Sequence, residues 1–306
     1  MRLSILLPFF LSMFLISTVS ADFKSDLADK YTQGVNTILF FTSEDIISSG
    51  HYTFDDSETT LDTHFVPFIY QFKSDSDFYN FYANGSIGFS KYEEEQIDFG
   101  RGILDTEKMT TYALKVGGGI RMNVFPNTDM MVGAAYIYSK VNSDFKTAKA
   151  LEGSNPDDKA IDDILNSNQT HHTYELSTSI GYHPTINKYQ PYFRAGVRHF
   201  QTNVDAPYAT ISDTTSVISK LKAGVITPEL TKIYDLPLKL EFYASEIFLA
   251  GDMDDVLGCD NFFVLGTTFH LASPIEKEWI KEVTLDINMV RGDNFDGFNF
   301  GFGLSF

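Results

Sequence analysis

Cysteine is almost absent from this sequence, and basic residues are scarce. Cys259 is the single cysteine, so the chain cannot form an intramolecular disulfide. The 23 Lys and Arg residues stand against 41 Asp and Glu residues, which gives a formal net charge of −18. We therefore expect no nucleic-acid partner, because contacts with phosphates need a basic face. Most of the acidic residues are expected to lie on a solvated surface.

Long apolar runs are also lacking, except at the very start of the chain. Met1-Arg2 is followed by an apolar stretch from Leu3 to Ile16 and then by Val19-Ser20-Ala21. A charged start, an apolar centre and small residues before a cleavage position are typical of a secretory signal peptide, so we expect residues 1–21 to be removed. Beyond them, no stretch approaches the ~20 apolar residues that a membrane-spanning helix needs.

The last ten residues alternate strictly between large apolar and small or polar side chains. Phenylalanine or leucine occupies every even position from Phe298 to Phe306. A β-strand points successive side chains to opposite faces, so one face of this stretch is apolar and the other is small and polar. Such strands suit a transmembrane β-barrel, which contacts lipid outside and leaves no backbone group unpaired. A terminal aromatic is typical of bacterial outer-membrane proteins, and we expect the barrel assembly machinery to recognise Phe306.

The same alternation recurs along the chain and predicts twelve strands. In the clearest internal example, Tyr112, Leu114 and Val116 would face lipid while Thr111 and Lys115 face inward. The first strand lies somewhere between residues 36 and 56. The others are predicted at 63–72, 78–90, 111–124, 130–142, 173–184, 191–202, 216–227, 236–250, 261–271, 283–291 and 297–306. The longest polar connections are predicted at 91–107 and 143–170.

An even number of strands with both ends in the periplasm is the usual topology of bacterial outer-membrane barrels. We therefore predict an all-β fold, a single antiparallel up-and-down barrel over residues 36–306 in the bacterial cell outer membrane. Residues 22–35 show no strand alternation. We interpret them as a short helix or an irregular segment, either in the periplasm or inside the lumen.

Four stretches resemble the solitary outer-membrane autotransporter-like β-barrel family: Ser49–Asp56, Tyr82–Phe89, Ala113–Gly119 and Gly292–Gly301. The resemblance extends over nearly the whole chain after the leader. It implies a twelve-stranded barrel similar to an autotransporter translocator but without a secreted passenger. It brings no catalytic residues with it.

Charged side chains on the polar strand faces predict the lining of the lumen. Charges cost a few kcal/mol on the lipid face but meet water or partners inside. Two interpretations are open: a wall that selects anions or docks a plug, or a network of salt bridges that fills the pore. The predicted lining residues are Lys115, Arg121, Glu175, Arg194, Arg198, Lys220, Lys222, Lys239, Glu241, Glu282 and Asp286.

We expect neither catalytic nor metal sites. Outer-membrane phospholipases place a His and a Ser two apart on a strand, and no His-x-Ser sequence occurs here. His171 and His172 are adjacent and would point apart on a strand, so a pair at a loop tip is the favoured interpretation. Asp293–Gly297 resembles part of a calcium loop but lacks its later Glu, which favours a polar hairpin turn. No cofactor is expected.

Two functions of different classes are open on the sequence alone. The first is a small pore or translocator-type channel of unknown substrate. The second is a closed structural or surface-interaction barrel whose acidic outer loops meet partners, and an outer-membrane lipid hydrolase is less favoured. In each case we expect a monomer in contact with outer-membrane lipid and lipopolysaccharide.

Overall fold

The computed structural model describes residues 47–54, 58–72, 74, 76–97, 105–147, 168–205, 213–252, 260–272 and 282–305. The regular structure within these ranges consists of β-strands, and none of the described residues forms a helix that could cross a membrane. The predicted signal peptide, the segment 22–35, Cys259 and Phe306 all lie outside the described residues.

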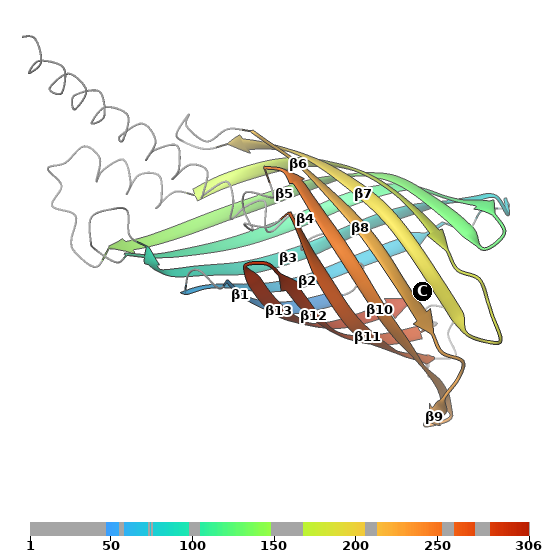
Figure 1. Cartoon of the computed structure of the whole chain (residues 1–306). Coiled ribbons are helices and arrows are strands. Elements are labelled where there is room, and N and C mark those ends of the chain that lie inside the picture. Colours follow the sequence, from blue (N-terminus) through green and yellow to red (C-terminus); the bar gives the residue numbers. More distant parts are fainter. Residues whose placement is uncertain are drawn as a thin grey trace, which may run out of the picture.

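Twelve long strands and one short strand make up the fold (Figure 1). Their bounds are β1 Ile47–Phe54, β2 Glu58–Gln71, β3 Tyr79–Ile97, β4 Asp105–Phe125, β5 Thr128–Thr147, β6 Asn168–Tyr182, β7 Gln190–Asp205, β8 Thr214–Ile226, β9 Thr231–Ile233, β10 Leu236–Gly251, β11 Asn261–Ala272, β12 Glu282–Gly292 and β13 Phe295–Ser305.

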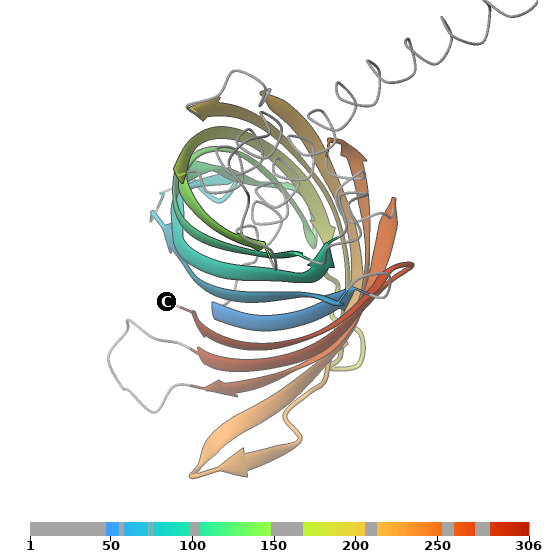
Figure 2. The same cartoon turned by 90° about the vertical axis from the view of Figure 1, so that its left-hand side faces the viewer.

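The sheet closes on itself into a barrel, as Figure 2 shows in a view from one end. The long strands pair antiparallel in chain order, with β8 joined directly to β10. The last strand returns to the first, from Ile47 opposite Phe302 to Phe54 opposite Phe295. The predicted twelve-stranded barrel is confirmed. The extra strand, β9, lies in the connection between β8 and β10 and pairs with the start of β10.

The two ends of the barrel differ. The start of β1 and the end of β13 lie together at one end, which also carries the connections after β2, β4, β6, β8 and β11. We call it the turn end, and the opposite end the loop end. The loop end carries the connection between β5 and β6, residues 148–167.

Large apolar side chains cover the outside of the barrel. Exposed examples are Phe68 and Tyr70 on β2, Leu114 on β4, and Phe298 and Phe300 on β13. Such a surface would be unstable in water but matches the hydrocarbon layer of a membrane. The predicted alternation is therefore confirmed on these strands.

The inward face changes character along the barrel axis. In the half nearer the loop end, buried apolar residues line it, among them Leu61, Phe200, Ile218, Ile247 and Phe262. Buried polar residues, among them Thr63, Thr173 and Thr202, lie between these apolar ones, so the inner wall is mixed in this half. In the half nearer the turn end, charged side chains are prominent on the inner wall.

The predicted loop at 91–107 is also wrong. The hairpin of β3 and β4 extends to Ile97 and Asp105, with Glu93 directly opposite Lys108. The Lys108 ammonium lies 2.7 Å from the Glu93 carboxylate. Beyond the apolar band both faces of a strand can carry polar side chains, so the ladder continues without the alternation that marks it in sequence. For the same reason the connection predicted at 143–170 shrinks to 148–167.

The two adjacent histidines do not lie at a loop tip, because β6 begins at Asn168 and contains both. As two neighbours on a strand should, they point to opposite faces. His171 is fully buried inside, and the His172 ring lies against Tyr136 with 2.5 Å between Nδ1 and the Tyr136 hydroxyl. The predicted polar hairpin after Gly292 is confirmed, since β12 ends at that residue and β13 begins at Phe295.

Candidate functional site

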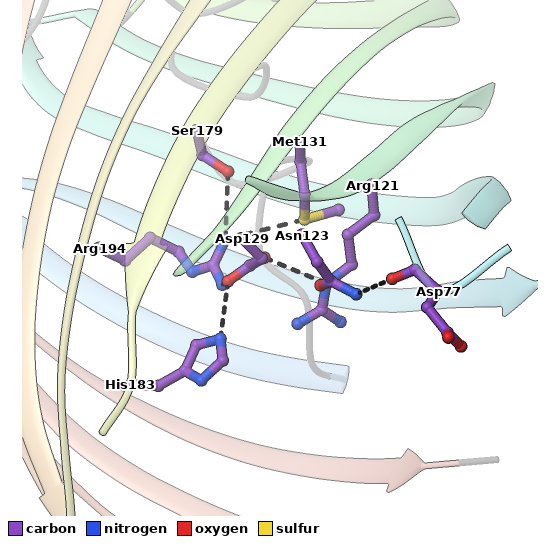
Figure 3. A network of polar contacts seen from close by, with 8 residues as sticks. All are labelled: Asp77, Arg121, Asn123, Asp129, Met131, Ser179, His183 and Arg194. Atoms are coloured by element: carbon purple, nitrogen blue, oxygen red, sulfur yellow. Dashed lines mark hydrogen bonds and ion pairs between the residues drawn. The ribbon is translucent and has the colours of Figure 1, made fainter. Parts of the chain in front are cut away.

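A first polar cluster, near the turn end of the lumen, is centred on the carboxylate of Asp129 (Figure 3). Asp129 is the second residue of β5, directly after a tight turn in which Asn127 adopts a left-handed conformation (φ 59°). Asparagine tolerates that conformation better than most residues, and the turn brings the end of β4 beside the start of β5. The Asp129 side chain is only 1% exposed, so its charge needs partners.

Three basic side chains supply them. Arg121 Nε lies 3.1 Å from one carboxylate oxygen, and Arg194 Nη2 lies 2.9 and 3.1 Å from the two oxygens. His183 lies in the connection after β6, and its Nε2 is 3.0 Å from a carboxylate oxygen of Asp129. Arg194 also donates to Ser179 at 3.2 Å. Two guanidinium groups on one carboxylate leave a positive charge at the turn end of the lumen. Asp129 is absent from the predicted lining residues because it lies between the predicted strands 111–124 and 130–142.

A second cluster is centred on Glu241 of β10. Lys222 Nζ of β8 lies 3.1 Å from one carboxylate oxygen, and His270 Nε2 of β11 lies 2.9 Å from the other. The Tyr192 hydroxyl also donates to Glu241. The other ring nitrogen of His270 lies 2.8 Å from the Glu282 carboxylate, so one imidazole links two acids. Lys222, Glu241 and Glu282 are among the predicted lining residues, whereas Tyr192 and His270 are not.

Asp286 on β12 anchors a third group of contacts. It accepts hydrogen bonds from Thr268 (2.6 Å), Asn288 (2.7 Å) and the Tyr243 hydroxyl (3.0 Å). Asn288 in turn accepts one from Asn299 on β13 at 2.9 Å. Three donors on one buried carboxylate compensate much of its lost hydration. This group therefore joins β10, β11, β12 and β13 along the inner wall.

Near the middle of the barrel, Lys115 and Glu175 form a buried ion pair. The ammonium of Lys115 on β4 lies 2.5 Å from the carboxylate of Glu175 on β6, and the two side chains are 6% and 4% exposed. The remaining predicted lining residues are Arg198, Lys220 and Lys239. All three are half-buried, and each lies an even number of residues from the inward residues of its own strand, so it belongs to the inward face. Whether any of these residues selects a solute stays a prediction.

Inward tyrosines lie flat against the wall because glycines stand opposite them. Tyr243 is paired across the strands with Gly266, where an added Cβ would come within 2.2 Å of its ring. Tyr52 lies on Gly297 in the same manner, also at 2.2 Å. A larger residue at either glycine would push the ring away from the sheet. These glycines thus keep bulky side chains out of the centre of the lumen.

The ion pairs of the inner wall also lie along the wall. Each one between described residues of the inner wall joins neighbouring strands or strands separated by one other, as Lys222–Glu241 and Lys115–Glu175 illustrate. None among the described residues reaches across to the opposite wall. Charge is therefore arranged along the circumference of the barrel.

A barrel of this kind is also found in a known protein family. Residues 32–302 match the model of the solitary outer membrane autotransporter beta-barrel domain. The chain belongs to this family. Autotransporter barrels of this type are outer-membrane proteins, and the resemblance drawn from the sequence motifs is confirmed.

Solved structures agree on the fold. The translocator domain of NalP from Neisseria meningitidis superposes with a TM-score of 0.59 at 12% identity, covering 94% of this chain and 98% of that one. The transport unit of AIDA-I from Escherichia coli gives a TM-score of 0.56 at 10% identity, covering 90% and 99%. The beta domain of Bordetella BrkA gives 0.58 at 10% identity, covering 85% and 97%. No curated protein sequence matches the chain.

Proposed function

We propose that the barrel is a small pore or translocator-type channel of the outer membrane. The observation that carries the proposal is the circumferential arrangement of its inner charges. Twelve strands about 4.8 Å apart and tilted by about 40° enclose a cylinder roughly 24 Å across between backbones. Ion pairs such as Lys222–Glu241 stay on one side of that space, and Tyr243 lies flat on Gly266. A network that filled the pore would instead connect opposite walls.

The proposed solute preference is for anions. At the turn end, Asp129 is shared by two guanidinium groups, which leaves an excess of positive charge on the wall. Lys239 adds a further positive charge on the inward side of β10. A local excess of one sign of charge in a narrow channel concentrates the opposite ion.

The segment 22–35 belongs to the proposal as a plug that sits in or against the lumen and limits conduction. In this proposal its acids, Asp22, Asp26 and Asp29, meet basic residues of β7, β8 and β10. Two of those residues, Arg194 and Lys222, already hold acids of the wall. The attraction that remains for the plug is accordingly smaller than the sequence suggested.

Planar bilayers test the proposal. We expect ion-selective conductance steps from the purified barrel, and larger, steadier steps after deletion of residues 23–33 behind an intact cleavage site. A folded barrel that stays silent in both forms would support the alternative, a closed structural or surface-interaction barrel. Identical traces from the two folded forms would reject the plug alone. Folding is checked by the shift in gel mobility on boiling.

Export, partners and chemistry complete the proposal. The chain is exported, loses residues 1–21 and is inserted by the barrel assembly machinery as a monomer in contact with lipid and lipopolysaccharide. Conduction itself requires neither a cofactor nor catalysis. Within the described ranges, no three His, Cys, Asp or Glu side chains are grouped to hold a metal ion.

A further inference from the structure

Four polar side chains form a compact block on the outside of the barrel, on β1 and β2. Ser49 stands directly opposite His64, and His51 stands directly opposite Asp62. The inward positions between them, Gly50 among them, are buried, so these four side chains point outward. We call Ser49, His51, Asp62 and His64 the outer polar block.

The contacts inside the block pair a hydroxyl with one imidazole and a carboxylate with the other. Ser49 Oγ lies 2.7 Å from His64 Nδ1. His51 Nδ1 lies 2.6 Å from a carboxylate oxygen of Asp62. The Ser49 and His64 side chains are exposed, and those of His51 and Asp62 are 61% and 45% exposed. All four are therefore accessible from outside.

The block lies where the apolar outer wall becomes polar. On β2, the next outward residues toward the turn end are Val66, Phe68 and Tyr70, all exposed. On the neighbouring strands, Ser49 stands beside Phe300, and the His64 ring is stacked on Phe89 at 5.9 Å. An amphiphile whose chain lies along these side chains would present its polar linkage at the level of the block.

We propose that the outer polar block is a serine hydrolase site that cleaves carboxylic esters of membrane lipids. The proposal goes beyond conduction and does not depend on it. The chain lacks His-x-Ser but carries the reverse order, Ser49-Gly50-His51, on β1, and the second histidine comes from β2. Only the register between β1 and β2 brings these groups together.

Each member of the block has a defined role. Ser49 is the nucleophile and His64 Nδ1 the base that accepts its proton, because a hydroxyl and a neutral imidazole at this distance form such a pair. Asp62 fixes the His51 ring by accepting from Nδ1–H and stabilises its protonated form. His51 then offers its Nε2–H to the carbonyl oxygen. Backbone N–H groups are committed to ladders on both sides of β1, so a side chain must take this role.

The reaction proceeds through an acyl-serine. Ser49 Oγ bonds to the ester carbon as its proton moves to His64, and His51 stabilises the negative charge on the carbonyl oxygen. The bond to the alcohol breaks, and the alcohol leaves with the proton held on His64. Water then attacks the acyl-serine while His64 takes its proton and returns it to Ser49 Oγ. The products are a fatty acid and an alcohol.

Labelling and hydrolysis test the site in the full-length barrel held in detergent micelles. We expect a fluorophosphonate probe to modify Ser49, identified by mass spectrometry of the digested protein, and a chromogenic medium-chain ester to be hydrolysed. The variants are Ser49→Ala and His64→Gln, which keeps a hydrogen-bonding group but removes the base. Both should lower the rate at least 100-fold, as loss of a nucleophile or general base does. Thr53→Ala, on the same outward face of β1, is the matched control and should keep the rate.

The shift in gel mobility on boiling shows that each variant has folded. A folded wild-type barrel with no labelled Ser49 and no hydrolysis above the micelle background would overturn the proposal. Equal rates for wild type and Ser49→Ala would overturn it as well. Neither result bears on conduction, so the proposed pore is judged separately.

Discussion

Replacing Asp129 by asparagine isolates the contribution of a buried lumenal carboxylate that three basic side chains contact. The change keeps the shape of the side chain but removes the negative charge between Arg121 and Arg194. A hydrogen bond to a charged group contributes about 1.5–3 kcal/mol to stability. The Arg121 and Arg194 side chains are 33% and 35% exposed, so water recovers part of the loss once the carboxylate is gone. We therefore expect Asp129→Asn to destabilise the barrel by about 2–3 kcal/mol, less than the ~3–5 kcal/mol typical of a fully buried broken pair.

Unfolding in urea from lipid vesicles measures this change as a lower midpoint. Asp293→Asn is the matched control, because it removes the same charge from an exposed hairpin position, and it should stay within about 0.5 kcal/mol of wild type. Adding Arg121→Gln to Asp129→Asn should restore part of the stability by removing one of the unpaired charges. If Asp129→Asn and Asp293→Asn have the same urea midpoint of unfolding, the reasoning about this carboxylate is refuted.

Three further predictions concern packing, assembly and export. Gly266→Ala should lift the Tyr243 ring off the wall and destabilise the barrel by about 1–3 kcal/mol in the same urea assay, whereas Gly196→Ala, whose Cβ meets its nearest neighbour at 3.2 Å, should cost less; equal effects would contradict the packing argument. Deleting Phe306 should lower outer-membrane levels and raise periplasmic degradation, as measured in fractionated cells, and unchanged levels would remove its assembly role. Mass spectrometry of the mature protein should find its first residue directly after Ala21, and a soluble periplasmic product without a mobility shift on boiling would contradict both export and the barrel.

The outward face was predictable because lipid imposes one rule on every strand that crosses it. Tyr112, Leu114 and Val116 follow that rule, and the structure confirms their exposure. The rule fails where lipid ends, so the sequence predicts a loop where β3 extends through Glu93 to Ile97. The rule also fails at His171, because this residue lies near the start of β6, outside the stretch in which apolar residues alternate.

The partners of the lumenal charges were not predictable, because side-chain periodicity gives the face of a residue but not its neighbour. Lys115 meets Glu175 across an intervening strand, which depends on the registers of both β4 with β5 and β5 with β6. Asp129 gathers residues from β4, β7 and the connection after β6. The same limit hid Ser49 and His64, whose contact depends on the register of the first hairpin.

The unequal lengths of the strands give the loop end a sloping rim. β3, β4 and β5 contain 19, 21 and 20 residues, whereas β12 and β13 contain 11 each (Figure 1). On the tall side, charged pairs such as Glu93 and Lys108 stand above the apolar band and shield the entrance from the bilayer. On the low side, the ends of the strands lie nearer to the apolar outer face. In the proposed channel, a solute that left over the low side would therefore reach the membrane surface beside β1, the strand that carries Ser49 and His51.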